Sequence, residues 1–378
     1  MHALFQFVKN THKSVYEGIF LAFDLASLLG RKNPPLIGLD ISSFDIKLVE
    51  LTEGSNKAYR LERYASEPLP KGAVQDGNIE NIEQVSETIR KLVKRSGANT
   101  KNVALAMPAA AVITKKILLP ATLSDQALEI QVESEASQYI PFSMDEVSLD
   151  FCVIGPAPNQ EDVEVMLAAS RKEKIEDRVA VAQAAGLQAK VMDVESYAAR
   201  AAMVRLIEMQ ANEGRDQIYA IFQIGTKRTN IYILLNGEVV YEREQQFGGS
   251  QLTQDIVRNY GLSQEEAELK KKTGDLPDSY EMELLEPFLE NAALEVTRAI
   301  QFFFTSTPYT RVDQIFLTGG CAVVTGLVDI VAERTKISTA VISPFKGMEL
   351  AAGVNEKVLR NDAPAYTIAC GLALRRFG

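Results

Sequence analysis

An aspartate, two hydroxyls and a lysine that could together hold a phosphate group and its metal ion interrupt a largely apolar stretch near the start of the chain. Residues 36–51 read LIGLDISSFDIKLVEL, and these four residues are Asp40, Ser42, Ser43 and Lys47. The pattern predicts two short strands joined by a polar turn. The hydroxyls and backbone N–H groups of such a turn can surround an anion, and a lysine adds a positive charge. An aspartate cannot bind phosphate directly, but it can hold a hydrated Mg²⁺ ion.

A second stretch of the same kind follows at an offset of 183 residues. Residues 222–234 read FQIGTKRTNIYIL, and the equivalent positions hold Gln223, Gly225 and Thr226, with Thr229 as a further candidate ligand. A repeat of this kind predicts two similarly built lobes, and two such turns facing each other would form a polar cleft. The alternative interpretation is a pair of ordinary hairpins with solvated turns.

A glycine-rich turn provides a third candidate binding element. A predicted strand runs into Gly319, Gly320 and Cys321, and an apolar helix is expected to follow. Glycine at such a junction lets a flat ligand approach the backbone closely. Strand–glycine–helix turns are also common in α/β domains without a ligand, so this turn does not identify a site by itself.

The composition excludes several other kinds of chemistry. A net charge of −10 argues against broad binding to nucleic acid. Cys152, Cys321 and Cys370 lack paired spacing, which indicates reduced thiols of a cytosolic protein rather than disulfides or a zinc site. The only histidines of the sequence are His2 and His12, so the rest of the chain has no imidazole for a catalytic triad or a metal.

Residues 1–33 are expected to form a separate N-terminal extension. Their apolar stretch, residues 19–29, has 11 residues and contains Asp24, whereas a membrane-spanning helix needs about 20 apolar residues. A signal peptide is a weaker alternative, because no clear small-residue cleavage site follows. We expect a peripheral or disordered segment.

The ordered set of elements resembles the actin/Hsp70 ATPase superfamily. That superfamily has a first phosphate hairpin, a connecting helix, a second phosphate hairpin, an adenosine turn and a second connecting helix. The matching segments here are, in the same order, residues 39–51, 191–203, 222–234, 317–327 and 365–376. Within the superfamily, the segments GLDISSFDIKLVEL, EASQYIPF, VMDVESYA and LTGG are most similar to the PilM family of type IV pilus assembly proteins, which itself resembles the division protein FtsA.

The resemblance implies an α/β, two-lobed actin-like ATPase fold. It consists of duplicated RNase H-like domains, with an FtsA-like 1C subdomain inserted into the first lobe. The expected division is a first-lobe core at residues 34–60, 187–215 and 355–378, an inserted subdomain at residues 61–186 and a second lobe at residues 216–354. Hydrophobic patterns predict strands within residues 103–120, 147–155 and 163–171, and helices at residues 125–140, 172–186 and 286–306.

The resemblance also implies that the chain binds ATP and Mg²⁺, with Asp40 holding the metal through water. Glu268 and Lys271, on a charged helix at residues 262–277, would reach the adenosine hydroxyls. A solvated, salt-bridged face is the commoner explanation of such a charged run.

Two departures from the superfamily pattern bear on hydrolysis. The first hairpin usually reads Asp-x-Gly and the second usually begins with Asp, whereas this chain has Ser42 and Gln223. Glutamine carries no charge for a metal-bound water, so we expect slow or absent hydrolysis. Glu195 is a weak candidate catalytic residue that could orient a water molecule, and the alternative is a helix cap or surface carboxylate.

Nucleotide binding does not explain the inserted region, and the resemblance implies a role in partner recognition. PilM-family proteins hold a short N-terminal cytoplasmic peptide of the inner-membrane protein PilN in a groove beside this subdomain, and extended peptides commonly bind in grooves. Tyr139, Ile140 and Phe142 could line that groove or could be core residues at a helix end. The expected function is a cytoplasmic nucleotide-binding scaffold of the type IV pilus inner-membrane assembly complex, which contacts the membrane indirectly through PilN and other pilus components.

Two other functions stay open, and so does a homo-oligomeric state. One is an actin- or Hsp70-like ATPase, against which stand Gln223, Ser42 and the lack of an obvious substrate-binding insertion. The other is an FtsA-like cell-division protein. FtsA-type chains carry an amphipathic membrane helix after the second connecting helix, and we expect none here because LALRRFG occupies that place.

Overall fold

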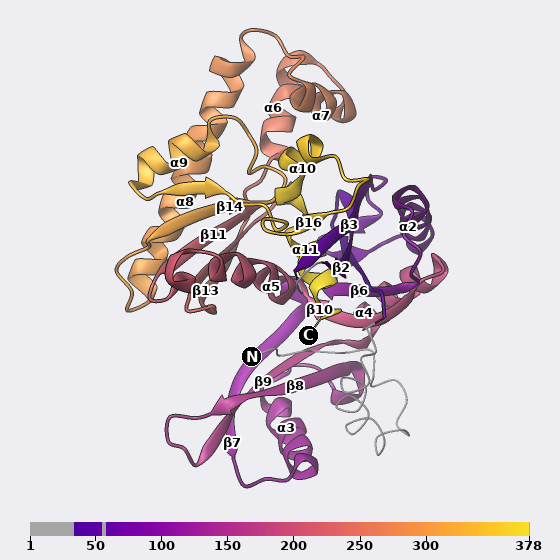
Figure 1. Ribbon diagram of the computed structural model, residues 1–378, viewed down its shortest axis with the longest axis vertical. Coiled ribbons are helices and arrows are strands. Elements are labelled where there is room, and N and C mark those ends of the chain that lie inside the picture. Colours follow the sequence, from indigo (N-terminus) through magenta and orange to yellow (C-terminus); the bar gives the residue numbers. More distant parts are fainter. Residues whose placement is uncertain (1–33, 55–57, 378) are drawn as a thin grey trace. The chain divides into compact units, whose positions relative to one another are not determined.

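The computed structural model describes residues 34–54 and 58–377, which form two compact units (Figure 1). The first unit contains the residues up to Ala201, the segment Gly347–Val354 and the residues from Ile368 onwards. The second unit contains Ala202–Lys346 and Asn355–Thr367. The predicted N-terminal extension, residues 1–33, lies outside the described residues.

A six-stranded sheet forms the core of the first unit, in the order β10-β6-β1-β2-β3-β16. Its strands are β1 (Ile37–Ile41), β2 (Asp45–Glu53), β3 (Tyr59–Pro68), β6 (Asn102–Met107), β10 (Gln188–Val194) and β16 (Glu349–Leu350). The predicted first hairpin is confirmed: β1 and β2 are antiparallel and pair Asp40 with Lys47. On the other side of β1, β6 and then β10 continue the sheet in parallel. All five residues of β1 are buried, as expected for a strand covered on both faces.

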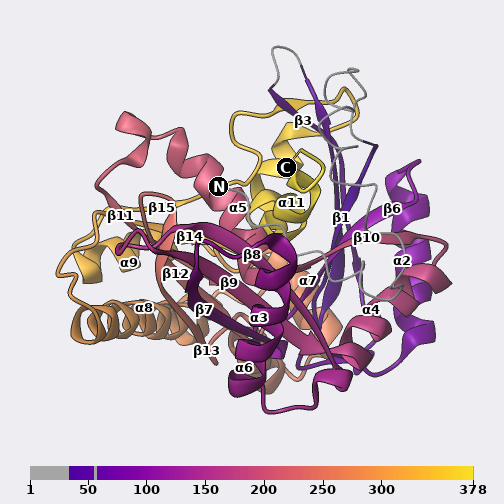
Figure 2. The ribbon, with the colours of Figure 1, turned by 90° about the horizontal axis from the view of Figure 1, so that it is seen from below.

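Helices cover both faces of this sheet. The helices α2 (Ile82–Ser96) and α4 (Lys172–Ala184) pack against each other on one face, and a short hairpin of β4 (Val74–Gln75) and β5 (Asn78–Ile79) precedes them. On the other face lie α11 (Thr367–Leu374) and the start of α5 (Glu195–Glu208). Figure 2 shows the sheet with α2 and α4 on one side and α11 on the other.

Two glycines allow α11 to approach its neighbours closely. A Cβ atom on Gly38 would lie 2.0 Å from Ala369 O, and one on Gly371 would lie 1.7 Å from Ala198 O. Because these neighbours are backbone atoms, they cannot rotate away from an added methyl group. The spacing of β1, α5 and α11 therefore depends on the absence of these two side chains.

Gly371→Ala is accordingly expected to lower the free energy of unfolding by about 2 kcal/mol. Overpacking destabilises the variant, and the higher helix propensity of alanine offsets part of that loss. Denaturant unfolding followed by circular dichroism measures the change. Gly353→Ala is the matched control, because a Cβ atom there would meet nothing within 4 Å. If the two variants are equally stable, then α5 and α11 can move apart to accommodate the added methyl group without a loss of stability.

A smaller antiparallel sheet, also in the first unit, has the order β7-β9-β8. It consists of β7 (Val112–Pro120), β8 (Val147–Pro156) and β9 (Asp162–Arg171). The helix α3 (Asp125–Tyr139) packs on this sheet. The buried residues between them include Ile117, Val132, Ala136, Val165 and Leu167. The predicted cap of α3 is present, since Ser124 Oγ accepts from Ala127 N at 3.3 Å. This separate sheet spans residues 112–171. The strands β3 and β6, which overlap the expected insertion of residues 61–186, pair with β2 and β1 in the six-stranded sheet.

The second unit contains a five-stranded sheet in the order β13-β12-β11-β14-β15. Its strands are β11 (Ile218–Ile224), β12 (Thr229–Leu235), β13 (Glu238–Gln245), β14 (Gln314–Thr318) and β15 (Thr339–Val341). This order repeats β3-β2-β1-β6-β10 of the first unit, with antiparallel pairing across the first three strands and parallel pairing across the last three. The repeat that the two hairpins predict therefore extends over whole sheets.

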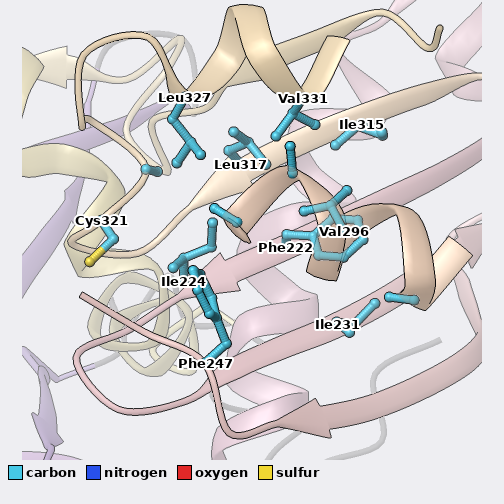
Figure 3. Packing of buried hydrophobic residues seen from close by; sticks show 14 of the residues in the cluster. Phe222, Ile224, Ile231, Phe247, Val296, Ile315, Leu317, Cys321, Leu327 and Val331 are labelled. Carbon is cyan, nitrogen blue, oxygen red and sulfur yellow. The ribbon is translucent and has the colours of Figure 1, made fainter. Parts of the chain in front are cut away.

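The helices of the second unit are α6 (Ser250–Tyr260), α7 (Gln264–Thr273), α8 (Glu286–Ser306), α9 (Leu327–Thr335) and α10 (Glu356–Asp362), with a π-helical turn, Glu281–Leu285, before α8. The predicted apolar helix at residues 286–306 is confirmed, and α8 and α9 pack together. Figure 3 shows the resulting core, in which Phe222 of the sheet lies near Val296 of α8, and Ile315 and Leu317 of the sheet lie near Val331 of α9.

Candidate functional site

The turn of the first hairpin is closed by the hydroxyl group of Ser42. Its Oγ accepts from the backbone N–H groups of Phe44 and Asp45 at 3.1 and 3.0 Å and donates to Asp45 Oδ1 at 2.7 Å. Lys47 Nζ forms an ion pair with the same carboxylate, and Ser43 is half-buried in the turn. The candidates Ser42 and Lys47 are thus organised through Asp45, which the sequence pattern does not indicate as a site residue.

Asp40 lies beside this turn, near the end of β1, and is only 5% exposed. Burial raises the pKa of its carboxyl group, whereas the positive charges of Lys47 and Arg178 lower the pKa and the nearby Asp45 raises it. Lys47 is the direct neighbour of Asp40 across the hairpin, and Arg178 belongs to α4. Burial is the largest of these effects, so the pKa of Asp40 lies above its usual value, and the two cations offset only part of the cost of holding the ionised form that could bind a hydrated metal ion.

Two further carboxylates follow at the end of β10. Asp193 is 1% exposed, and its Oδ2 accepts from Arg375 Nε at 2.5 Å. Burial raises the pKa of Asp193, and the Arg375 guanidinium lowers it. The ion pair between these two side chains connects β10 to the segment after α11. Glu195, the first residue of α5, instead interacts electrostatically with Arg178. Glu195 and Asp40 therefore share one cationic partner.

Gln223 takes the position of Asp40 in the second hairpin, directly opposite Asn230. Its Oε1 atom is buried and has no hydrogen-bond partner. An unpaired buried acceptor costs about 1–3 kcal/mol, so this oxygen is suited to a donor such as a water molecule of a hydrated metal ion. The amide can orient such a water but adds no negative charge.

The turn of the second hairpin packs against a pair of glycines that begins α6. Gly249 N donates to Gly225 O at 3.0 Å, and Ser250 N donates to Thr226 O at 2.8 Å. A Cβ atom on Gly248 would lie 2.5 Å from Thr226 O, so a larger residue would push the turn away. Gly248 and Gly249 are not among the predicted site residues. Their signal in the sequence is a Gly-Gly pair directly before the residues that form the amphipathic helix α6.

The glycine turn after β14 packs on the same strand end. Gly319 has a φ of +88°, and a Cβ atom on it would lie 2.4 Å from Ile224 O. Cys321 N donates to Ile224 O at 3.1 Å, and Cys321 Sγ donates to Gly225 O at 3.4 Å. A Cβ atom on the exposed Gly320 would meet nothing within 4 Å, so the backbone is open at that residue. Figure 3 shows Cys321 at the edge of the core, on the side of Ile224.

A cluster of charged and hydroxyl groups from α6 and α7 lies near Cys321. Lys271 Nζ lies 2.8 Å from Glu268 Oε1 and donates to Thr253 Oγ1 at 2.6 Å, and Thr253 also bonds to Glu268. Glu268 and Lys271 are each 16% exposed. Burial raises the pKa of Cys321 to about 11, while Lys271 lowers it and Glu268 raises it. The structure thus brings the predicted pair close to the predicted glycine turn.

The thiol of Cys321 is consequently expected to react slowly. With a pKa of about 11, only about one Cys321 side chain in a thousand is a thiolate at pH 8, and the rate of alkylation should rise about tenfold per pH unit up to pH 10. Iodoacetamide labelling followed by peptide mass spectrometry measures the rate, with the half-buried Cys152 as an internal reference. Labelling of Cys321 as fast as that of a free thiol at pH 8 would contradict this enclosed environment.

Thr229, a candidate ligand in the second hairpin, forms a hydrogen bond within the protein itself. Thr229 is 3% exposed, and its Oγ1 donates to Phe247 O at 2.8 Å. This bond anchors the segment that leads into Gly248. Thr229 therefore supports the site through the backbone around it.

The smaller sheet carries a small, open groove that is lined by Ala111, Ile113, Ile140, Phe142, Val147, Ala169, Ser170 and Arg171. Two of the three predicted groove residues are among them: Ile140, which is 6% exposed, and Phe142, which is 41% exposed. The Arg171 guanidinium lies 5.4 Å from the centre of the Phe142 ring. Tyr139 is 42% exposed but does not line the groove, and Lys115 Nζ lies 4.9 Å from its ring centre.

Comparison with known proteins identifies the family of this chain. The family described as "Type IV pilus assembly protein PilM" matches residues 38–377.

This chain belongs to the PilM family.

Solved structures agree with this assignment. The protein from the "PilM-PilN type IV pilus biogenesis complex" is 26% identical, has a TM-score of 0.76, and is matched over 92% of this chain and 99% of that chain. The ethanolamine utilization protein EutJ from Carboxydothermus hydrogenoformans is 18% identical with a TM-score of 0.52, over 90% of this chain and 89% of that chain, which is a likeness of fold alone. The predicted two-lobed actin-like ATPase fold is confirmed, as is the association with type IV pilus assembly.

The donor set of this PilM-family chain fits a hydrated magnesium ion better than a directly coordinated metal. In residues 34–54 and 58–377, no three His, Cys, Asp or Glu side chains form a cluster that could hold a metal ion. Mg²⁺ keeps several waters and needs few carboxylates when a phosphate supplies the other ligands. In the first unit, the single buried carboxylate of Asp40 beside the Ser42 turn is consistent with that mode of binding.

No helix within the described part of the chain combines the length and the hydrophobicity needed to cross a membrane.

Proposed function

We propose that this PilM-family protein binds Mg²⁺-ATP and scaffolds the inner-membrane assembly complex of the type IV pilus. The observation that carries the nucleotide part is the matched register of the hairpins, which puts Asp40 opposite Lys47 and Gln223 opposite Asn230. Each hairpin thus has one oxygen-bearing side chain for a metal-bound water at the same position.

Each element has a defined part in this binding. The bound metal would neutralise phosphate charge, with Asp40 and Gln223 accepting hydrogen bonds from its waters. The N–H groups of the turns at Ser43 and Thr226 would donate to phosphate oxygens. Lys47 would contribute a positive charge, in competition with its ion pair to Asp45.

The base and ribose would lie against the second unit. Glu268 provides an acceptor and Lys271 a donor, which together suit the two hydroxyl groups of a ribose. Gly320 leaves open backbone at the glycine turn, where a flat base can pack. The proposal therefore favours a nucleoside triphosphate over inorganic phosphate alone.

Isothermal titration calorimetry tests this proposal with ATP in Mg²⁺, ATP in EDTA, and sodium triphosphate in Mg²⁺. We expect Mg²⁺-ATP to bind most tightly, and Lys47→Ala and Thr226→Val each to weaken its binding. If ATP does not bind, or if neither variant weakens its binding, then nucleotide binding by the hairpins is refuted.

Hydrolysis is proposed to be slow because Gln223 supplies no charge. We expect the native protein to turn over far below about 1 s⁻¹, and Gln223→Asp to raise the rate at least about tenfold by providing a base for the attacking water. Phosphate release at saturating Mg²⁺-ATP measures both rates. Asn230→Asp adds the same charge opposite Gln223 and should not raise the rate. Native turnover near 1 s⁻¹ would overturn the assignment of a non-enzymatic scaffold.

We further propose that the groove on the smaller sheet binds the N-terminal cytoplasmic peptide of PilN. The support is the match over 92% of this chain to the protein from a PilM–PilN complex, together with the apolar lining of the groove. An extended peptide with apolar side chains suits a groove of this composition. Binding would recruit the protein to the inner membrane through PilN, from the cytoplasmic side.

A further inference from the structure

A cluster of buried hydroxyl groups lies at the start of the glycine turn after β14. Thr318, the last residue of β14, is fully buried, and Thr367, the first residue of α11, is 1% exposed. Their Oγ1 atoms lie 2.7 Å apart, and they lie 2.9 and 3.1 Å from the carbonyl oxygen of Pro364. Because a buried hydroxyl without a partner is costly, these three groups satisfy one another.

The same carbonyl group also holds the first residue of the turn. Gly319 N donates to Pro364 O at 2.8 Å. Each threonine hydroxyl has one proton, so one hydroxyl donates to Pro364 O and the other donates to its neighbouring hydroxyl. The two lone pairs of the carbonyl oxygen are then both used. The cluster thus connects two consecutive residues, Thr318 and Gly319, to the segment that leads into α11.

These contacts fix the turn at the place where the proposed nucleotide would meet it. Thr318 pairs with Gln223 in the parallel register of β11 and β14, so the turn starts level with the polar position of the second hairpin. Gly319 is held by its bond to Pro364 O, and the next residue, Gly320, is exposed and has open backbone. The cluster therefore anchors the chain directly before the residue against which a base would pack.

We propose that Thr318 and Thr367 are positioning residues that hold the backbone of Gly319 and Gly320 in the orientation that a base requires. Glycine has the largest conformational freedom of any residue, so a Gly-Gly turn does not fix its own orientation. The hydroxyl cluster supplies that constraint from residues that do not touch the ligand. This inference rests on the proposed binding of Mg²⁺-ATP and adds the residues that shape its base-binding surface.

A purely structural role for the two hydroxyls predicts a different result. The loss of any buried hydrogen bond lowers stability. A positioning role predicts in addition that the folded variant binds ATP more weakly, whereas its affinity for triphosphate, which has no base, changes little. It also predicts that serine, which keeps the hydroxyl group, retains the affinity for ATP.

The variants are Thr318→Val, which keeps the branched shape, and Thr318→Ser, which keeps the hydroxyl group. Titration calorimetry in Mg²⁺ should show that Thr318→Val binds ATP about tenfold more weakly, the effect of losing one buried hydrogen bond, and binds sodium triphosphate nearly as the native protein does. Thr318→Ser should bind ATP within about threefold of the native affinity, although the lost methyl group lowers stability. Native ATP affinity in folded Thr318→Val, or equal losses of ATP affinity in the two variants, would overturn the positioning role.

Thr88→Val is the matched control. Thr88 is a buried threonine of α2 in the first unit, at 5% exposure, and its Oγ1 donates to Gln84 O at 2.8 Å. Its loss should lower stability and leave ATP affinity unchanged. Thr367→Val should act like Thr318→Val, and the double variant should lose little more, because each hydroxyl depends on the other. Fully additive losses would contradict a shared cluster.

A second measurement separates this inference from the proposed function. Without nucleotide, hydrogen exchange of the Gly319 amide should be about tenfold faster in Thr318→Val than in the native protein, because the anchor at Pro364 is weakened. Unchanged exchange would refute the inference whether or not ATP binds. Faster exchange in Thr318→Val, if the native protein fails to bind ATP, would uphold the positioning of the turn and refute the proposed function alone.

Discussion

Asp40→Asn is expected to weaken the binding of Mg²⁺-ATP by about 10- to 100-fold, the usual effect of removing an outer-sphere partner of a metal ion. Asparagine keeps the size of the side chain but removes the charge that Lys47 and Arg178 offset. Affinity for ATP in EDTA should change much less, because Asp40 has no favourable contact with phosphate itself. Titration calorimetry with and without Mg²⁺ measures both affinities.

The matched control for this variant is Glu50→Gln. Glu50 is a carboxylate of the same hairpin that is also buried, at 6% exposure, but it lies away from the turn and pairs with Arg63 at 2.9 Å. Its loss should lower stability and leave the effect of Mg²⁺ intact. If the two variants bind Mg²⁺-ATP equally well, then Asp40 does not hold the metal.

The hairpins could be predicted from the sequence because their signal is local. Apolar strands on either side of a short polar turn give β1–β2 and β11–β12, and a fixed offset reveals their duplication. The sheet partners could not be predicted in the same way. β3 and β6 join the main sheet because they pair with β2 and β1, and nothing in the patterns of residues 59–68 or 102–107 specifies those partners.

The site residues likewise differ in whether their sequence signal is local. Residues on the turns, such as Ser42 and Gly319, follow from the special backbone geometry that turns require. Arg178 and Asp45 act through contacts across the fold or within the closed turn, which spacing alone does not reveal. A signal for Arg178 nevertheless exists, since it occupies an apolar position on the face of α4 formed by Ile175, Val181 and Ala182.

The difference between the duplicated hairpins indicates how the two units can have diverged in role. The first hairpin has a buried carboxylate with two cationic neighbours, whereas the second has a neutral amide with an unpaired oxygen. A neutral amide can orient a metal-bound water but lacks the charge of the base that fast hydrolysis requires. In the proposed function, the nucleotide would accordingly serve to stabilise one conformation.

Phe142→Ala is expected to weaken binding of the PilN N-terminal peptide by about 30-fold, as for an aromatic residue in the centre of an interface. Phe142 forms one wall of the groove next to Ile140, and Arg171 lies over its ring. Removing the ring opens the groove to water and removes apolar area that the peptide would cover. Fluorescence anisotropy with a labelled peptide of the PilN N-terminus measures the change.

Tyr139→Ala provides an unusually close control for Phe142→Ala. The two aromatic side chains are 42% and 41% exposed, and each has a cation near its ring, so truncation should affect stability to a similar extent. Only Phe142 lines the groove, and Tyr139→Ala should therefore change peptide affinity by less than about threefold, as expected outside a hot spot. If both variants lose peptide affinity equally, then the peptide lies over the exposed end of α3 instead of in the groove. If affinity is unchanged in both, then the peptide does not bind to this face of the smaller sheet.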